Sequence, residues 1–478
     1  MKYETVIGLE VHAELATKTK IYCSCENSFG GDTNTRCCPV CIGLPGALPV
    51  LNRTVVDYGI KAGLSMHCNI ASYCKQDRKN YFYPDLPKAY QISQFDLPLC
   101  YDGYVEIDTE DGMKNIGITR IHIEEDAGKL LHAEGANFSL VDYNRGGVPL
   151  IEIVSEPDMR SPEEALAFLE AIKSTLQAIG VSDCKMQEGS LRCDINVSVR
   201  PEGQKEFGVR SECKNVNSFH AAVRAIRYER DRQIAVLEAG GTVEQETRRW
   251  DDAKGESFVM RSKEEAHDYR YFPEPDLMPI YVDEPWIESL RETLPELPQE
   301  KKKRYVEDYD LPKYDAGLIG ASLGLSNLFE DAVKEGAKPK AVSNWLLGEI
   351  SKILNETMLA AEDIPFGGKA LAELISLIES DTISGTIAKK VIAEMFESQK
   401  SPGEIVKEKG LAQISDEGAI IGIIQDVLAQ NPAAVEDFRA GKEKAMGFLT
   451  GQAMRASRGK ANPGVIQKLL REALEALK

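Results

Sequence analysis

The sequence lacks long hydrophobic runs. No apolar segment approaches the roughly 18 residues that suggest a membrane-spanning helix. At the amino terminus, Glu4 and Glu10 lie where a secretory signal would be apolar. We therefore expect neither a membrane span nor a signal peptide, and we predict a cytoplasmic protein.

The sequence also lacks an excess of positive charge. The 57 Lys and Arg residues stand against 76 Asp and Glu residues, which gives a formal net charge of −19. Such a chain repels nucleic acid on average, so any contact with RNA must come from a local basic patch. One patch near the C-terminus is either a solvated helix face or a contact with phosphates. Its cations are Lys442, Lys444, Arg455, Arg458 and Lys460.

Several catalytic motifs are missing. The chain has no G-x-x-x-x-G-K-[ST] loop, no G-x-S-x-G elbow and no Ser-Ser-Lys arrangement in a glycine-rich stretch. These absences argue against a P-loop enzyme and against an amidase. If the protein carries out nitrogen chemistry, its ammonia must be made elsewhere.

The length of 478 residues predicts two to four domains. Residues 1–292 mix short alternating runs with turns and two helices, which is typical of an α+β domain. One of these helices is expected to begin at Ser161 and Pro162 and to end near Gly180. Strand patterns then disappear, so we expect a helical domain at 293–402 and a small helical tail at 403–478.

The eleven cysteines are an odd number in a chain without a predicted signal, which favours thiols or a metal site over disulfides. In "CPVCIG" two cysteines have the spacing of a zinc knuckle, and a second pair lies upstream. We predict a structural Zn²⁺ site at Cys23, Cys25, Cys38 and Cys41, because four thiolates leave no open position. Cys37 is the alternative to Cys38, and scattered buried thiols are the competing interpretation.

Strict alternation marks "LEVHAEL" as a half-buried strand whose polar face carries Glu10, His12 and Glu14. A solvated face would explain this segment alone. Other predicted strands, however, also carry acids with interleaved bases. Carboxylates that hold Mg²⁺ beside cations that neutralise phosphate match the needs of phosphoryl transfer. The residues concerned are Glu124, Glu125, Glu152, Arg192, Asp194, Glu212 and Lys214.

Two further segments, "KQDRKNYFYPDLPKAYQISQ" and "DYRYFPEPDL", place tyrosines among cations. The first contains Lys79 with Tyr81, Tyr83 and Tyr90. This combination is usual where a substrate with both a ring and phosphate or carboxylate groups binds. Amphipathic loops packed on the domain are the alternative.

Together these motifs resemble the B subunits of the tRNA-dependent amidotransferase GatCAB. The likeness runs from residue 4 to residue 462 through "ETVIGLEVHAEL", "DRKNYFYPDLPKAYQISQ", "GITRIHIEEDAGK", "LIEIVSEPD", "MQEGSLRCDINVSVRP", "DYRYFPEPDL" and "KAMGFLTGQAMRASRGKANP". It implies a cradle domain around a mostly antiparallel sheet, similar to glutamine synthetase and guanido kinases, followed by helical domains. It also implies ATP- and Mg²⁺-dependent phosphorylation of the side-chain carboxylate of Glu on tRNA(Gln) or Asp on tRNA(Asn), and then amidation. Ammonia would come from a partner amidase (glutaminase), the A subunit, with a small C subunit completing a heterotrimer.

The resemblance also implies roles for individual residues. Glu10, His12, Glu125 and Glu152 become the metal candidates, with Glu124 in reserve, because alternation places only one of the adjacent glutamates on that face. The basic patch is expected to contact the tRNA body. The residues expected around the ATP phosphates and the substrate carboxylate are Lys79, Arg192, Asp194, Glu212 and Lys214, of which Lys79, Arg192 and Lys214 bind the nucleotide.

Two other functions compete with this one. The first is a zinc-stabilised scaffold that binds misacylated tRNA without catalysis, although acidic strand faces repel a phosphate backbone unless a metal intervenes. The second is a ligase for a free small carboxylate, which leaves the basic tail unexplained. The sequence leaves open whether Glu-tRNA(Gln), Asp-tRNA(Asn) or both are substrates.

Overall fold

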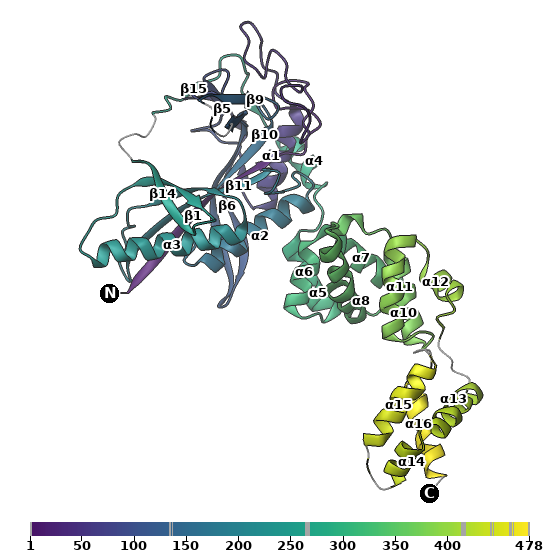
Figure 1. Ribbon diagram of the computed structural model, residues 1–478. Coiled ribbons are helices and arrows are strands. Elements are labelled where there is room, and N and C mark those ends of the chain that lie inside the picture. Colours follow the sequence, from purple (N-terminus) through teal and green to yellow (C-terminus); the bar gives the residue numbers. More distant parts are fainter. Residues whose placement is uncertain are drawn as a thin grey trace. The chain divides into compact units, whose positions relative to one another are not determined.

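The computed structural model describes residues 2–132, 135, 137–262, 268–412, 417–439, 442, 444–457, 461 and 463–476. The chain divides into two compact units, Met1–Glu300 and Lys301–Lys478, which are described separately (Figure 1). Within the described residues, no helix combines the length and the apolar character that crossing a membrane requires.

A nine-stranded sheet forms the centre of the first unit. All its neighbouring strands are antiparallel except β12 and β13, so the expected mostly antiparallel sheet is confirmed. The analogy to glutamine synthetase and guanido kinases stays a prediction. In spatial order the strands are β14 (Glu256–Ser262), β13 (Glu246–Asp251), β12 (Ser211–Val216), β11 (Leu191–Pro201), β1 (Tyr3–Glu14), β10 (Pro149–Ser155), β7 (Gly112–Glu125), β6 (Cys100–Thr109) and β2 (Asn69–Ile70).

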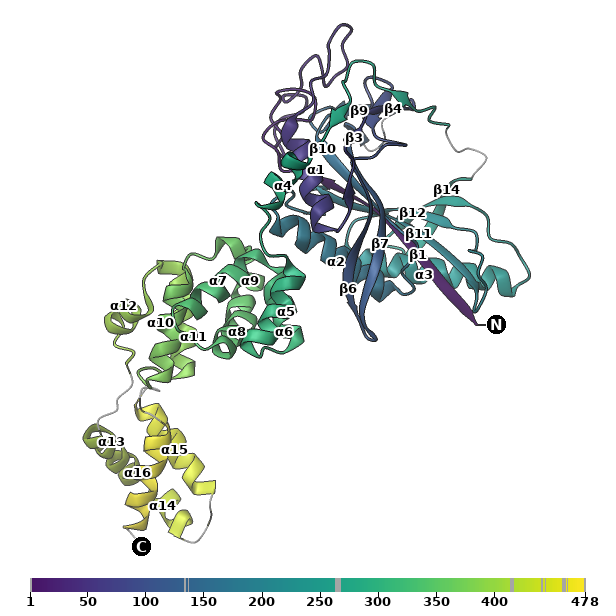
Figure 2. The same cartoon turned by 180° about the vertical axis from the view of Figure 1, so that it is seen from behind.

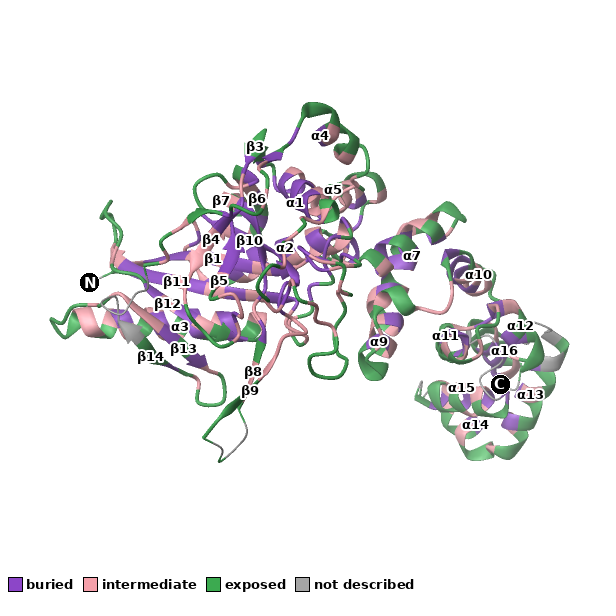
Figure 3. Cartoon of the chain, turned by 90° about the horizontal axis from the view of Figure 1, so that it is seen from above, coloured by how far each residue is buried: buried purple, intermediate pink, exposed green. Residues whose placement is uncertain are grey.

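Alternation along β1 gives the sheet one apolar and one polar face. Leu9, Val11 and Ala13 are buried on the apolar face. They belong to the same hydrophobic core as α1 (Arg53–Ser65), α2 (Pro162–Ala178) and α3 (Phe219–Glu238), which pack against the sheet (Figures 1 and 2). The central strands are accordingly among the most buried parts of the unit (Figure 3). The polar face of β1 is left for other contacts.

Helix α2 begins and ends where the sequence predicted. The side chain of Ser161 accepts a hydrogen bond from the backbone N–H of Glu164, and Pro162 occupies the first helical position. Gly180 follows the helix with a φ of +69°, a conformation that glycine adopts without strain. This helix therefore takes its boundaries from local chemistry.

Among the described residues of the first unit, three small sheets and one short helix accompany the large sheet. The sheet β15-β4-β5 adjoins the end of β7, since the side chain of Gln91 donates a hydrogen bond to the backbone oxygen of Glu125. Its strands are β4 (Asp77–Asn80), β5 (Tyr90–Ser93) and β15 (Phe272–Pro273). The remaining elements are the pair β3 (Tyr73–Cys74) and β16 (Ile280–Tyr281), the pair β8 (Lys129–His132) and β9 (Ser139–Asp142), and α4 (Glu284–Arg291).

The second unit is helical throughout its described residues, with separate hydrophobic clusters between Tyr305 and Val406 and between Ile420 and Leu474. The predicted boundaries at 292 and 402 stay predictions, and the division into units falls after Glu300. The elements are α5 (Pro298–Tyr309), α6 (Lys313–Ala321), α7 (Leu323–Lys334), α8 (Pro339–Trp345), the π-helix η2 (Leu346–Ile350), α9 (Ser351–Thr357), the 3₁₀ turn η3 (Ala361–Asp363), α10 (Gly368–Glu379), α11 (Gly385–Ser398), α12 (Pro402–Glu408), α13 (Glu417–Gln430), α14 (Pro432–Arg439), α15 (Lys444–Ala456) and α16 (Pro463–Glu475).

Candidate active site and metal centre

Strand register brings the predicted residues together on the polar face of the large sheet. His12 of β1 lies opposite Glu152 of β10 on one side and Arg192 of β11 on the other. Glu152 in turn lies opposite His122 of β7. Two residues before His12, Glu10 lies opposite Asp194 of β11. Because directly opposite side chains on one sheet face are neighbours, the register assembles a site from four distant segments.

The first group of candidate ligands consists of His12, Glu124 and Glu152, whose ligand atoms lie within 4.8 Å of one another. His12 Nε2 is 3.3 Å from Glu152 Oε2 and 3.9 Å from Glu124 Oε1. The buried ring of His122 reaches the same carboxylates, at 3.5 Å from Glu152 and 3.8 Å from Glu124. Burial opposes protonation of His122, but the two carboxylates outweigh it and raise the pKa of this ring to about 9.

The second group consists of Glu10, Asp194 and Glu212, again within 4.8 Å of one another. Lys214 forms ion pairs with Asp194 and, at 2.8 Å, with Glu212. The Asn196 amide donates a hydrogen bond of 3.1 Å to Glu10. Burial, together with the charges of Glu152, Glu212 and Asp194, raises the pKa of Glu10. The group is therefore rich in negative charge that a bound cation would offset.

His12 and Glu152 of the first group and all three residues of the second group line one cavity of about 370 Å³. Lys79 of β4 lines it, with its Nζ 5.0 Å from the ring centroid of Tyr269. The cavity therefore lies between the polar face of the large sheet and the small sheet that carries β4. Carboxylates, lysines and aromatic rings converge here, which is the arrangement expected of a binding site for an anionic substrate and a cation.

The cavity also contains polar residues to which the sequence analysis assigns no role. Arg120, His122, Asn196 and Arg210 line it, and in the sequence they lie at steps of two from the selected glutamates and Asp194. Thr247 had no such signal. Its hydroxyl donates a hydrogen bond of 2.9 Å to Glu212 because β13 pairs in parallel with β12. A parallel partner comes from far along the chain, so local patterns do not reveal it.

One prediction about this cavity needs correction, and a second is not tested by the geometry. Glu125 was preferred to Glu124 as a metal ligand, but its side chain points to the other face of β7, where it pairs with Lys88 and accepts a hydrogen bond of 2.9 Å from the Ile92 N–H. Strand alternation requires this, and Glu124 takes the place in the cluster. Arg192 does not line the cavity, and its Nη2 lies 2.6 Å from Asp126. Its role beside the ATP phosphates stays a prediction.

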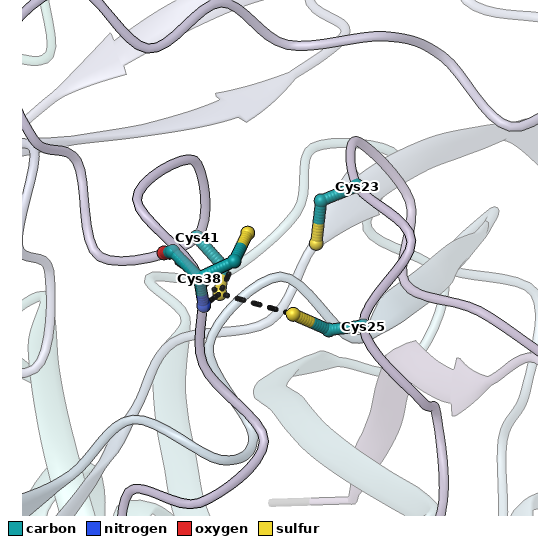
Figure 4. Close-up of side chains that lie close together, drawn as sticks. All are labelled: Cys23, Cys25, Cys38 and Cys41. Carbon is teal, nitrogen blue, oxygen red and sulfur yellow. Dashed lines mark hydrogen bonds between the residues drawn. The ribbon is translucent and has the colours of Figure 1, made fainter.

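The four cysteines selected from the sequence come together in the first unit, with their sulfur atoms pointing toward one another (Figure 4). Cys41 Sγ lies 3.8 Å from Cys38 Sγ and 4.0 Å from Cys25 Sγ. Four sulfurs around Zn²⁺ at a Zn–S distance of about 2.3 Å stand about 3.8 Å apart, so the donor set fits zinc. Cys37 instead points to Asn144, which agrees with the choice of Cys38.

Local hydrogen bonds prepare Cys41 to act as a thiolate. The neighbouring Cys23 thiol, the Cys38 N–H that donates to the Cys41 sulfur at 3.0 Å, and the charge of Lys20 together lower the pKa of Cys41 to about 4 against the effect of burial. A thiolate is the form that coordinates zinc.

We expect the purified wild-type protein to contain about one zinc per chain and the Cys41→Ser variant to contain almost none. Loss of the metal should also lower the thermal midpoint, because zinc ties the two cysteine pairs together. Metal analysis by mass spectrometry and a thermal scan of the same samples would measure both. Cys37→Ser is the matched control and should keep its zinc, whereas equal zinc in Cys41→Ser would contradict the site.

The basic residues of the tail lie in the second unit. Lys444 and Arg455 are exposed at the start and in the last turn of α15, and Lys442 is exposed and pairs with Asp437 at 2.8 Å. Arg458 and Lys460 lie outside the described residues. A role for this patch in RNA binding stays a prediction.

The fold and the cavity define a general class of protein. Its members have an α+β domain with a cavity lined by carboxylates and lysines, and a helical unit follows this domain in the chain. Comparison with known families agrees with this class. Residues 5–288 match the family model described as the GatB/GatE catalytic domain, and residues 327–474 match the model described as the GatB domain. The chain belongs to the GatB family, and the resemblance inferred from its motifs is confirmed.

Similar proteins from several bacteria carry the name of the B subunit of aspartyl/glutamyl-tRNA(Asn/Gln) amidotransferase. The protein of Caldicellulosiruptor saccharolyticus is 61% identical over 480 residues and covers 100% of both chains. That of Thermoanaerobacter pseudethanolicus is 60% identical and covers 99% of this chain and 100% of its own length. That of Clostridium botulinum is 55% identical and covers 99% of each. The likeness therefore extends over both units.

Proposed function

We propose that this chain uses ATP to phosphorylate the side-chain carboxylate of Glu misacylated on tRNA(Gln), or of Asp misacylated on tRNA(Asn), and then joins ammonia to it. The observation that carries the proposal is a single cavity whose lining contains residues of both clusters of candidate metal ligands together with Lys79 and Lys214. The name shared by the similar proteins supports the choice of substrate. The products would be Gln-tRNA(Gln) and Asn-tRNA(Asn).

The chemistry needs activation because a free carboxylate is a poor acyl donor. Transfer of the γ-phosphoryl group to a carboxylate oxygen gives an acyl phosphate and ADP. Ammonia then attacks the carbonyl carbon, the carbon–oxygen bond to phosphate breaks, and the amide loses a proton. The protein's task in such transfers is positioning and charge stabilisation.

The residues present fit divalent cations. Glu10, Asp194 and Glu212 offer oxygen only, which suits Mg²⁺, and this cation would neutralise charge on the transferring phosphoryl group. The group of His12, Glu124 and Glu152 includes a nitrogen and would accept a wider range of metals. Lys214 already neutralises Asp194 and Glu212, so a cation bound there would compete with it.

A second recess suits the base of ATP. It has a volume of about 210 Å³, and its walls include Val6, Gly8 and Phe207. Glu10, Asn196 and Arg210 line both this recess and the main cavity. A purine held between the apolar walls would therefore have its phosphates directed toward the carboxylates and Arg210.

The proposal includes partners. The sequence has no Ser-Ser-Lys arrangement in a glycine-rich stretch of the kind that an amidase needs, so a glutaminase subunit would supply the ammonia and a small third subunit would complete the complex. The exposed cations Lys442, Lys444 and Arg455 would contact the tRNA body, and zinc at the four cysteines would support the fold.

The chain purified together with its amidase partner is expected to convert Glu-tRNA(Gln), Asp-tRNA(Asn) or both to the amide, with one phosphate released for each amide formed. Free ammonia should replace glutamine, because the amidation step would be independent of glutaminase chemistry. Thin-layer analysis of the aminoacyl group and a phosphate assay in the same samples would measure this. Binding of misacylated tRNA without release of phosphate would instead favour the zinc-stabilised scaffold.

A further inference from the structure

Aromatic rings form one wall of the cavity on the side of the small sheet. Phe95 and Tyr271 are stacked, with ring centroids 4.3 Å apart and planes 5° from parallel. Tyr269 meets Tyr271 edge-on at 6.0 Å, and Tyr81 meets Tyr269 at 5.7 Å. Phe95, Tyr269 and Tyr271 all line the cavity, and the proposed reaction leaves this wall without a role.

The local structure holds the stacked pair in place. The buried carboxylate of Asp77 accepts a hydrogen bond of 3.1 Å from the Phe95 N–H and pairs with Lys75 at 2.5 Å. Tyr271 directly precedes β15, which pairs with β4. Phe95 nevertheless remains 53% exposed. A fixed and exposed ring at the edge of a polar cavity offers a surface on which another ring can stack.

We propose that the pair of Phe95 and Tyr271 is the binding site for the 3′-terminal base of the aminoacyl-tRNA. This inference rests on the proposed function. The reacting carboxylate belongs to an amino acid esterified to the terminal ribose, so the terminal base must lie within the length of one aminoacyl nucleoside of the carboxylate. The rings meet this requirement, because they line the same cavity as Lys79 and His12.

The open form of the wall favours the RNA base over the base of ATP. A single-stranded end approaches from solvent, and such ends bind by stacking on exposed aromatic rings. The recess at Val6, Gly8 and Phe207 gives the ATP base a separate site, which joins the cavity at Glu10, Asn196 and Arg210 rather than at the rings. The positive charge of Lys79 beside Tyr269 suits the phosphates and carboxylate of an aminoacylated RNA end.

Kinetics of the intact complex would test this assignment. Phe95→Leu keeps an apolar side chain but removes the ring, and we expect the KM for Glu-tRNA(Gln) to rise about 5- to 50-fold while the KM for ATP stays near the wild-type value. Phe138→Leu is the matched control, since Phe138 is 59% exposed and lines neither the cavity nor the recess. An unchanged KM for the tRNA, or a rise in the KM for ATP alone, would overturn the assignment.

A binding measurement separates this inference from the proposed reaction. Wild-type complex should bind uncharged tRNA(Gln) more tightly than the same tRNA without its terminal adenosine, and Phe95→Leu should lose that preference. Phe95→Tyr keeps a ring and should recover most of it. If the wild type shows the preference but releases no phosphate, the proposed reaction fails and the base site stands. Equal wild-type affinity for both tRNAs would refute the base site alone.

Discussion

Glu10→Gln is expected to lower the rate of ATP-dependent phosphate release by on the order of 10²- to 10³-fold. Glu10 is one of three carboxylates within 4.8 Å of one another that offer only oxygen to a cation. Glutamine has the same shape but no charge, so the strand and its contact with Asn196 are kept while the affinity for Mg²⁺ falls. Phosphate release and amide formation should fall together, because the acyl phosphate precedes the amide.

The control for this variant lies on the same strand. Glu4 shares the polar face of β1 but pairs with Arg200 outside the cavity, so Glu4→Gln should turn over like the wild type. Binding of tRNA and glutamine hydrolysis by the complex should survive in both variants. If Glu10→Gln releases phosphate at the wild-type rate, Glu10 belongs to a solvated face. The catalytic cation would then have to be held by His12, Glu124 and Glu152.

Raising the Mg²⁺ concentration makes the same experiment more specific. A lost ligand weakens binding of the cation, so part of the lost rate in Glu10→Gln should return at high Mg²⁺. A variant that is only misfolded would not respond. The dependence of phosphate release on Mg²⁺, measured for the wild type and Glu10→Gln side by side, therefore distinguishes a ligand from a structural residue.

The sequence predicted most of this site because its main signals are local. Alternation in "LEVHAEL" placed Glu10 and His12 on one face, and the knuckle spacing selected Cys38 and Cys41. Alternation also required that only one of Glu124 and Glu125 could reach the metal group, but it could not decide which. That choice depended on the pairing of β7 with β10, which places His122 opposite Glu152.

The features of the site that the sequence did not predict depend on contacts between distant segments. Thr247 reaches the site through the parallel pairing of β13 with β12, and Arg192 forms its ion pair with Asp126. Neither partner is visible in a short window of sequence. The wall formed by Phe95 and Tyr271 likewise joins segments that are far apart in the chain. Residue types and strand faces are thus local properties, while the identity of each neighbour is a property of the whole sheet.

The second large effect is expected on the stability of the first unit, when a buried carboxylate outside the cavity is replaced. Glu229 of α3 is fully buried and accepts hydrogen bonds from Arg232 at 2.6 Å, Gln233 at 3.0 Å and Ser257 at 3.3 Å. Arg248 of β13 lies 3.5 Å away and is itself buried. The carboxylate therefore ties α3 to β13 and to the edge strand β14, and it balances the charge of a buried guanidinium.

Glu229→Gln is expected to destabilise the first unit by about 3 kcal/mol. Removing one member of a buried ion pair costs about 3–5 kcal/mol because the other charge stays buried, and Glu246, 2.5 Å from Arg248, limits the loss to the lower end of that range. The urea midpoint, followed by the fluorescence of the buried Trp250 in a background of Trp286→Phe and Trp345→Phe, would measure the change.

Glu163→Gln provides the matched control for Glu229→Gln. Glu163 of α2 pairs at 2.6 Å with Arg227, which belongs to α3 like Glu229. Both side chains are exposed, so loss of this ion pair should cost no more than about 1 kcal/mol. Equal shifts in the two variants would contradict the assigned role of burial.

The stability difference between the wild type and Glu229→Gln should change with pH in a direction that the pKa of Glu229 determines. Burial alone would raise the pKa of this carboxyl, but Arg232, Gln233 and Arg248 outweigh it and lower the pKa below its ordinary value. A carboxyl with a lowered pKa in the folded state contributes stability that is fully present above its unfolded pKa of about 4.3 and is lost as the pH falls toward the folded value. The stability difference between the wild type and Glu229→Gln should therefore be constant near neutral pH and shrink below about pH 4.3. A difference that grew on acidification would mean that Glu229 is protonated in the folded protein, and that the charge of the buried Arg248 is balanced by other groups.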